Sequence, residues 1–258
     1  MSKVENKYIV ISLSLERLSQ DFFWNSALVP LSLARVTPVI YFEPPWDTLV
    51  GIIKNPLKWI KRYTQEKKII RRRNIPKNLK RIRLFSIFPW KWTNRWISAL
   101  NKTFVLLQIK WHIKAYDPRN RILLTYWRDS ADIIRKIPAY RRVYHCLHEI
   151  AGFPWPNEKA KTRAITEEIK VAKTVNSVLV VSHTLTQKMS QYNKNVKLLE
   201  DDVVDFELFN KGLSKPVPDE FKHLPRPIAG YVGNLSRFKQ DFNLSLIHIS
   251  EPTRLGMI

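Results

Sequence analysis

Short runs of β-branched and other apolar residues alternate along the chain with longer stretches whose apolar residues recur every three or four positions. The short runs are typical of buried strands, and the longer stretches predict helices. The predicted strands are residues 7–15, 37–44, 81–88, 121–127, 141–149, 177–183 and 195–202. The predicted helices are residues 24–35, 93–116, 130–137, 157–175 and 184–193. Strands that alternate with helices indicate right-handed crossovers, so the pattern predicts an α/β fold with a Rossmann-like, doubly wound parallel sheet.

Four residues bear on where the predicted helices begin. Pro30 lies inside the first helix and demands a late start or a kink, because proline has no backbone N–H to donate. Thr93 or Asn94 is available to cap the long second helix, and Ser130 to cap the third.

The same pattern indicates the domain organisation. Residues 1–212 hold the alternating strands and helices, and we expect them to form one domain. Residues 213–227 are rich in proline and polar residues and are typical of a linker. The run "IAGYVG" restarts the pattern at Ile228, so residues 228–243 are expected to open a second domain.

The last residues carry a different signal. "LSLIHISEPTR", Leu244 to Arg254, can be translated codon for codon from the end of a transposase-type sequencing-library adaptor. The start of an ordinary amphipathic helix is the alternative interpretation. We expect residues 244–258 to be an artefactual tail, and the second domain therefore to be truncated in this chain.

The charge of the chain is concentrated in one stretch. The formal net charge is +22, and thirteen Lys and Arg residues lie between Lys54 and Arg83 against the single acidic residue Glu66. Such a stretch favours an anionic partner, although a solvated basic loop without a partner has the same composition. Its Trp, Tyr and Ile residues suit an anionic membrane surface, with the aromatic rings at headgroup level. Nucleic acid is the competing partner, because stacking aromatics and cations also bind it; we favour lipid.

Several classes of protein are disfavoured by what the sequence lacks. Cys146 is the only cysteine, which excludes an intrachain disulfide and is compatible with a reducing cytosol. No stretch reaches the ~20 apolar residues of a membrane-spanning helix, so any membrane contact is expected to be peripheral. No H-E-x-x-H spacing and no glycine-rich nucleotide fingerprint occurs. We therefore expect neither a metal site nor a bound cofactor.

Candidate binding residues follow the ends of the predicted strands, where open parallel sheets bind their ligands. The segment after the first strand contains Asp21 and Trp24, and the segment after the second contains Trp46. Arg128 and Asp129 follow the fourth. Aromatic faces for stacking beside carboxylates that accept hydroxyl protons suit a polar, ring-shaped substrate.

The end of the fifth predicted strand holds the candidate catalytic groups. His145 and His148 face opposite sides if the strand continues, so one of them can pack in the interior. His148 and Glu149 are better placed to reach a ligand, where an imidazole can accept a hydroxyl proton and a carboxylate can orient it. The alternative is that both side chains make structural hydrogen bonds.

Several segments together resemble a known family. They are "VYHCLHEIAGFPWP", "VNSVLVVSHTLTQKMSQYNKNVKLLEDDVVDFELFN" and "LPRPIAGYVGNLSRFKQDFNL". The resemblance extends over about residues 141–243, and over the earlier part mainly through topology and the run "VIYFEPPW". In order and spacing these segments resemble retaining glycosyltransferases of family 4 with the GT-B architecture. Within that family they are most similar to the branch of teichuronic-acid and capsular polysaccharide biosynthesis enzymes.

The resemblance implies an N-terminal domain that binds the acceptor and a C-terminal domain that binds a nucleotide sugar. It implies that His148 and Glu149 are catalytic. The implied acceptor-binding residues are Asp21, Trp24, Trp46, Arg128 and Asp129, and the implied donor-binding residues are Asp202, Asp205, Gly233, Asn234, Arg237 and Lys239.

The expected function is sugar transfer from a nucleotide-sugar donor to a cell-envelope polysaccharide or a lipid-linked acceptor. The donor is a substrate, so no cofactor is expected. The expected location is the cytoplasm, peripherally on the inner face of the membrane, and the truncated chain is expected to be inactive by itself. The alternative function is a basic, aromatic-rich module on a Rossmann-like sheet that binds nucleic acid without catalysis.

Overall fold

The computed structural model describes residues 7–20, 25–89, 94–199 and 206–225. The chain divides into two compact units. The first comprises residues 1–151 and 157–204, and the second comprises residues 152–156 and 205–258.

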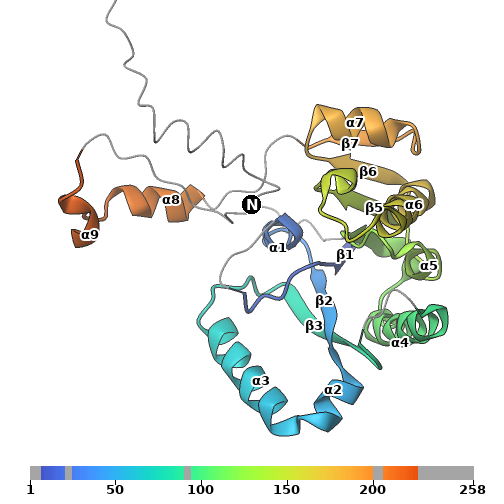
Figure 1. Ribbon diagram of the computed structural model, residues 1–258, viewed down its shortest axis with the longest axis horizontal. Helices are drawn as coiled ribbons and strands as arrows, with labels where there is room; N and C mark the ends of the chain where they lie inside the picture. The colour runs from blue at the N-terminus through green and yellow to red at the C-terminus, as the bar shows by residue number, and fades with distance from the viewer. Residues whose placement is uncertain (1–6, 21–24, 90–93, 200–205, 226–258) are drawn as a thin grey trace, which may run out of the picture. The chain divides into compact units, whose positions relative to one another are not determined.

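The first unit is built on a seven-stranded sheet in which every neighbouring pair of strands is parallel (Figure 1). The strands are β1 (Ile9–Leu13), β2 (Val39–Thr48), β3 (Leu79–Ser86), β4 (Arg121–Thr125), β5 (Arg141–Cys146), β6 (Ser177–Val180) and β7 (Val196–Leu198). Their order is β3-β2-β1-β4-β5-β6-β7, so the direction of winding reverses between β1 and β4. The predicted Rossmann-like, doubly wound parallel sheet is confirmed.

Helices connect these strands. They are α1 (Asn25–Leu33), α2 (Leu49–Lys54), α3 (Pro56–Arg71), α4 (Arg95–Ile113), α5 (Ala131–Arg135), α6 (Glu158–Thr174) and α7 (His183–Ser190). Short 3-10 turns, η1 (Pro118–Asn120) and η2 (Ile150–Gly152), follow α4 and β5. Each strand and helix predicted within residues 7–198 is present with shifted ends. The hydrophobic pattern missed α2 and α3, because α3 contains no buried residue and so has no apolar stripe to reveal it.

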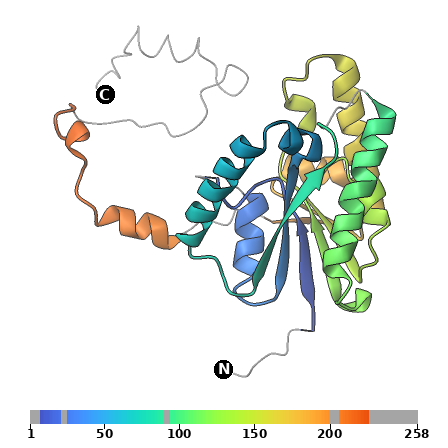
Figure 2. The same ribbon diagram turned by 90° about the horizontal axis from the view of Figure 1, so that it is seen from below.

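The sheet separates two hydrophobic cores. On one face, Ile9, Ile11 and Leu13 of β1 pack with apolar residues of α4, α5, α6 and α7. On the other face, Val10, Tyr41 and neighbouring residues pack with α1. In Figure 2 the green helix α4 and the blue helix α1 lie on opposite sides of the sheet. Successive strand residues alternate between these faces, which is why β1 is buried along its whole length.

The helix-start signals had different outcomes. The side chain of Asn94 accepts hydrogen bonds from the backbone N–H groups of Trp96 and Ile97 at 3.0 and 3.1 Å, so Asn94 caps α4. Ser130 occupies the capping position of α5 but makes no side-chain cap bond; its hydroxyl donates instead to the Trp127 carbonyl at 2.6 Å. Pro30 lies inside α1, which begins five residues earlier at Asn25.

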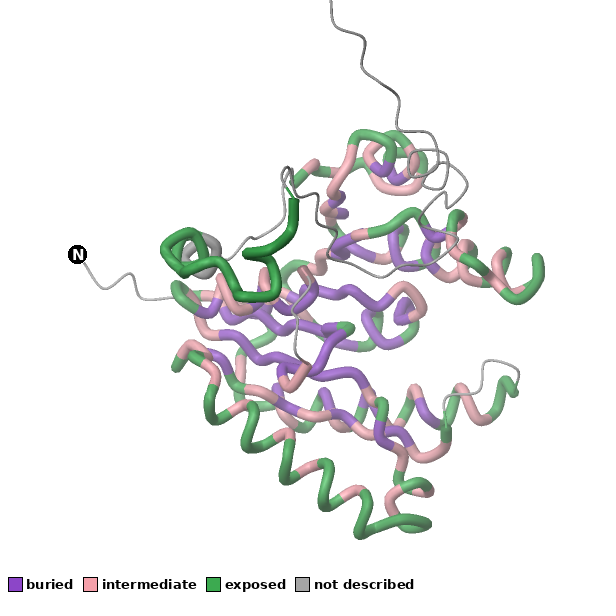
Figure 3. The backbone as a smooth tube through the Cα atoms, turned by 60° about the vertical axis from the view of Figure 1, so that its left-hand side comes forward, coloured by how far each residue is buried: buried purple, intermediate pink, exposed green. Residues whose placement is uncertain are grey.

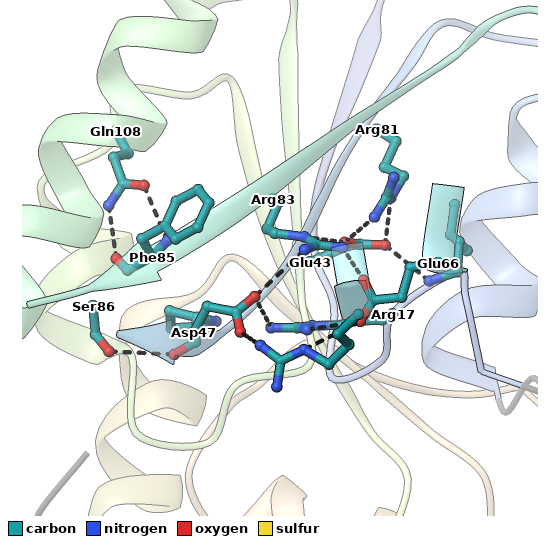
Figure 4. A network of polar contacts seen from close by, with 12 residues as sticks. Arg17, Glu43, Asp47, Glu66, Arg81, Arg83, Phe85, Ser86 and Gln108 are labelled. Carbon is teal, nitrogen blue, oxygen red and sulfur yellow. Dashed lines mark hydrogen bonds and ion pairs between the residues drawn. The ribbon is translucent and has the colours of Figure 1, made fainter. Parts of the chain in front are cut away.

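Two amide side chains of α4 fix the edge strand β3. Gln108 accepts from the Phe85 N–H at 3.0 Å and donates to the Phe85 carbonyl at 2.8 Å (Figure 4). Asn101, which is fully buried, accepts from the N–H groups of Ile87 and Phe88 and donates to the Phe88 carbonyl. These bonds satisfy backbone groups at the edge of the sheet and hold the carboxyl end of β3 in place.

The described part of the second unit contains two short helices, α8 (Phe206–Leu213) and α9 (Asp219–Lys222). The predicted linker, residues 213–227, therefore includes α9. The predicted strand at Ile228, the opening of the second domain at residues 228–243 and the tail at residues 244–258 lie outside the described residues.

Candidate functional site

A pocket of about 540 Å³ opens at the carboxyl ends of the strands around the point where the winding reverses. Its lining comes from the ends of β1, β2, β4 and β5, from the segments that follow them, and from Pro89 after β3. The lining residues are Leu15, Pro44, Pro45, Trp46, Thr48, Pro89, Tyr126, Trp127, Arg128, Asp129, Tyr144, His145, Leu147, His148 and Ile150. Open α/β sheets bind their ligands at such switch points, so this pocket is the candidate site.

Apolar groups form most of the pocket wall. Three prolines and the rings of Trp46, Tyr126, Trp127 and Tyr144 line it together with aliphatic side chains. The side chain of Trp46 is 54% exposed, so its ring stands at the rim. Walls of this kind bind the faces of rings and apolar chains, while a few polar groups fix the orientation of the ligand.

Hydrogen bonds between strand ends give the pocket its shape. The indole N–H of Trp127 donates to the Ser14 carbonyl at 2.7 Å, which ties the end of β4 to the end of β1. The Tyr41 hydroxyl donates to the Glu16 carbonyl at 3.0 Å and holds the segment after β1. Glu16 is itself buried and accepts from the Ser26 hydroxyl at 2.9 Å. The rim is therefore positioned by side chains that the core already orders.

His145 and Tyr126 form the polar floor of the pocket. His145 is buried, and its Nδ1 lies 3.4 Å from the Tyr126 hydroxyl. Burial raises the pKa of Tyr126 well above its usual value, and the nearby Tyr41 and Glu16 raise it further. Tyr126 is therefore a neutral hydroxyl at physiological pH, able to donate or accept a hydrogen bond.

Asp129 is the carboxylate of the pocket. Burial raises the pKa of Asp129 above its usual range, against the opposing attraction of Lys102. Asp129 also lines a second cavity of about 340 Å³, together with cations of α4 and α6 such as Arg95, Lys102 and Lys170. It therefore stands between an apolar pocket and a charged one.

The two predicted catalytic residues, His148 and Glu149, have different surroundings in the structure. His148 is exposed and lines the pocket, as expected of a group that meets a ligand. Glu149 is not among the lining residues: its carboxylate accepts from Lys188 Nζ at 2.7 Å and from the Ala151 N–H at 2.9 Å. Partial burial acts to raise the pKa of Glu149, but these two hydrogen bonds lower it below its usual value. Glu149 therefore holds the turn that carries His148.

Lys188 connects Glu149 to a carboxylate in the core. Glu168 of α6 is fully buried, accepts from the Tyr144 hydroxyl at 3.0 Å and lies 3.1 Å from Lys188 Nζ. Burial, followed by the charge of Glu168, raises the pKa of the Cys146 thiol to about 12. A thiol with such a pKa is protonated at neutral pH, so Cys146 is not a nucleophile.

The outcome for the other predicted site residues follows from their position. Trp46, Arg128 and Asp129, predicted to bind the acceptor, line the pocket. The remaining candidates lie outside the described residues: Asp21, Trp24, Asp202, Asp205, Gly233, Asn234, Arg237 and Lys239. The sequence reasoning overlooked Tyr126 and Tyr144, which read as ordinary strand residues until the strands are placed side by side.

A network of charged side chains, most of them buried, was also not predicted from the sequence (Figure 4). This arginine–carboxylate cluster consists of Arg17, Arg62, Arg81 and Arg83 with Glu43, Asp47 and Glu66. Glu43 is fully buried, and its carboxylate accepts hydrogen bonds from Nε and Nη2 of Arg81 at 2.6 and 2.9 Å. Arg17 Nη2 donates to Asp47 Oδ2 at 2.7 Å, and Arg62 also pairs with Asp47. Four arginines thus neutralise three carboxylates under α3.

Neither a metal site nor a membrane span is found in the part of the chain that the structure describes. Within residues 7–20, 25–89, 94–199 and 206–225, no three His, Cys, Asp or Glu side chains come together as metal ligands. No helix in those ranges is long and apolar enough to cross a membrane.

Comparison with known proteins adds little to this description. No protein-family model matches the sequence, and no curated protein does. Among solved structures, the chain is similar to the crystal structure of UGT73P12 from Glycyrrhiza uralensis complexed with glycyrrhetinic acid 3-O-monoglucuronide. The identity is 9%, the TM-score is 0.37, and the match covers 75% of this chain and 48% of that one. The chain thus spans about half the length of that protein. We assign the fold of the present chain from the strand order and the parallel pairing of its own sheet.

Proposed function

We propose that residues 7–199 form the acceptor-binding side of a glycosyltransferase that takes a sugar from a nucleotide-sugar donor. The observation that carries the proposal is the pocket at the switch point, where aromatic rings stand beside His145, His148, Arg128 and Asp129. Ring faces and hydrogen-bonding groups of this kind suit a hydroxylated, ring-bearing acceptor. The resemblance of residues 141–243 to retaining family 4 enzymes supports the same conclusion and names the acceptor class: an envelope polysaccharide or a lipid-linked glycan.

Each pocket group has a proposed role. His148 accepts the proton of an acceptor hydroxyl, since imidazole is the side chain that most often serves as a general base and His148 lines the pocket. Glu149, expected from the sequence to be catalytic, is proposed to position His148 through its bonds to Lys188 and the Ala151 N–H. Trp46 covers one face of the acceptor at the rim. Asp202, Asp205, Gly233, Asn234, Arg237 and Lys239 remain the proposed donor-binding residues.

Binding of a simple glycoside tests this proposal. We expect n-octyl glucoside, below its micelle concentration, to bind the chain in a calorimetric titration. Trp46→Ala removes the rim ring and should weaken binding roughly tenfold, since stacking and apolar burial of one ring are lost. His148→Gln should weaken it about fivefold through one lost hydrogen bond.

Trp111→Ala is the matched control. Trp111 of α4 is 66% exposed and does not line the pocket, so its loss should leave the affinity unchanged. Equal binding by the wild type and the Trp46 variant would overturn the proposal.

A further inference from the structure

Helices α2 and α3 present an unusual outer surface. The side chains of Ile53 and Leu57 are 78% and 81% exposed, and that of Ile60 is 51% exposed. Leu49, at the start of α2, is also exposed. Figure 3 shows α3 as a run of exposed and half-buried residues. Apolar side chains exposed to this extent in adjacent turns are uncommon on a protein that meets only water.

Lysines flank these apolar residues. Lys54, Lys58 and Lys61 are exposed, and among the described residues no carboxylate lies within ion-pair distance of any of them. Further along α3, Lys68 and Arg71 follow Lys61 at helical spacing and are exposed too. We call Leu49, Ile53, Leu57 and Ile60 with Lys54, Lys58 and Lys61 the α2–α3 ridge.

The basic stretch thus contains two populations of cations. Arg81 and Arg83 pair with carboxylates of the cluster from largely buried positions, and Arg62, whose side chain is 52% exposed, also pairs with Asp47. The lysines of the ridge face solvent. Alternation along β3 explains part of this division, because Arg81 and Arg83 point away from the face on which Ile82 and Leu84 pack under α4. The lysines of the ridge are therefore available to an external anion, whereas Arg81 and Arg83 are held by carboxylates.

The aromatic residues of α3 face the protein. Trp59 and Tyr63 are half-buried and stack on each other with ring centroids 5.0 Å apart. Trp59 also contacts Phe85, and the Arg83 guanidinium lies over the Tyr63 ring at 4.9 Å. Single-stranded nucleic acid is held by exposed rings on which bases stack. The ridge offers exposed Ile and Leu instead, and aliphatic side chains beside lysines suit the headgroup region of an anionic bilayer.

The ridge continues directly from the pocket. Thr48 lines the pocket, and its hydroxyl accepts from the Gly51 N–H at 2.9 Å, which caps α2. Trp46, two residues earlier, stands at the pocket rim. One segment of chain therefore forms a pocket wall at its beginning and the exposed apolar surface at its end.

We propose that the α2–α3 ridge docks on an anionic lipid bilayer, so that the pocket opens beside the membrane and receives an amphiphilic acceptor from it. The docking depends only on the ridge. The class of acceptor rests on the proposed function, and it extends that function by placing the acceptor in the bilayer.

Vesicle co-sedimentation of the full chain tests the docking. Binding is expected to vesicles of phosphatidylglycerol and phosphatidylcholine, and not to phosphatidylcholine alone. The triple variant Lys54→Gln, Lys58→Gln, Lys61→Gln should lose roughly fivefold in binding per lysine, on the order of a hundredfold in total. The variant Ile53→Ser, Leu57→Ser, Ile60→Ser keeps the charge and should lose at least tenfold, because apolar insertion is removed.

A matched control removes three exposed lysines elsewhere in the first unit: Lys136→Gln, Lys194→Gln, Lys197→Gln. It has the same net charge as the first variant and should bind within about twofold of the wild type. Equal losses of vesicle binding in the two lysine variants would show attraction by net charge alone and would overturn the proposed docking through the ridge. Binding to RNA without binding to acidic vesicles would overturn it as well.

A fluorescence measurement locates the contact. Cys146, the only cysteine, is buried, so a thiol introduced by Ile53→Cys can be labelled selectively with an environment-sensitive dye. A blue shift with acidic vesicles is expected at position 53 and not for Lys197→Cys on β7. No shift at position 53 would overturn the docking. Glycoside binding in the pocket is measured without vesicles, so the docking and the proposed function can fail independently.

Discussion

The arginine–carboxylate cluster and the pocket lie beside each other at the carboxyl ends of the strands, yet their polar groups are arranged differently. In the cluster every carboxylate meets arginines, and Glu43 is completely enclosed. In the pocket, His148, Arg128 and Asp129 face a cavity of about 540 Å³ lined mostly by apolar groups. The carboxylates of the cluster are paired within the protein, whereas the pocket groups line an open cavity. Charge density alone therefore does not identify a site.

The largest expected effect comes from breaking the cluster. Glu43→Gln keeps the shape of the side chain but leaves Arg81 without its buried carboxylate partner and removes one of the three carboxylates that Arg83 meets. We expect a loss of about 3–5 kcal/mol in the free energy of unfolding, because uncompensated buried charge is costly. Urea denaturation measures it.

Asp132→Asn is the control for that experiment. Asp132 is 64% exposed and pairs with Lys102 at 3.4 Å, so its removal should change the free energy of unfolding by less than about 1 kcal/mol. A Glu43 variant as stable as this control would show that the cluster is not structural.

A smaller effect, dependent on pH, is expected at Asp129 in the pocket. The pKa of Asp129 is raised above its ordinary value of 3.8, so the folded state binds the proton more tightly than the unfolded state. The contribution of Asp129 to the free energy of unfolding is most favourable below pH 3.8, where the carboxyl is protonated in both states. This contribution is lost as the pH rises through the raised pKa of the folded state. The stability of the wild type minus that of Asp129→Asn should therefore decrease from pH 4 upward. Unfolding curves of both proteins at a series of pH values measure this difference, and a rising difference would contradict the assignment.

The smallest effect on stability is expected at His148. This residue is exposed at the pocket, so His148→Gln should change the free energy of unfolding by no more than about 0.5 kcal/mol while weakening glycoside binding. A loss comparable to that of Glu43→Gln would place His148 with the structural groups. The pair of measurements thus separates residues that hold the fold from residues that meet a ligand.

The sequence by itself determined the sheet. Buried parallel strands read as continuous apolar runs, and these runs marked each strand from β1 to β7 as well as the helices with an apolar stripe. It also placed Trp46, Arg128, Asp129 and His148 at the strand ends where the pocket lies. Helices α2 and α3 were not predicted, because neither contains a buried residue and the hydrophobic pattern therefore does not mark them.

Only the tertiary structure decided which charged groups find partners. Glu43 and Arg81 are separated by 38 residues in the chain, and Lys188 and Glu149 by 39. No local sequence spacing predicts the hydrogen bonds between such distant side chains. Strand pairing brings the first pair together, and the packing of α7 brings the second. The contact with Lys188 is one basis on which we propose a positioning role for Glu149. Long-range contacts also separate Arg81 and Arg83, which carboxylates hold in the cluster, from the exposed lysines of the α2–α3 ridge in the same basic stretch.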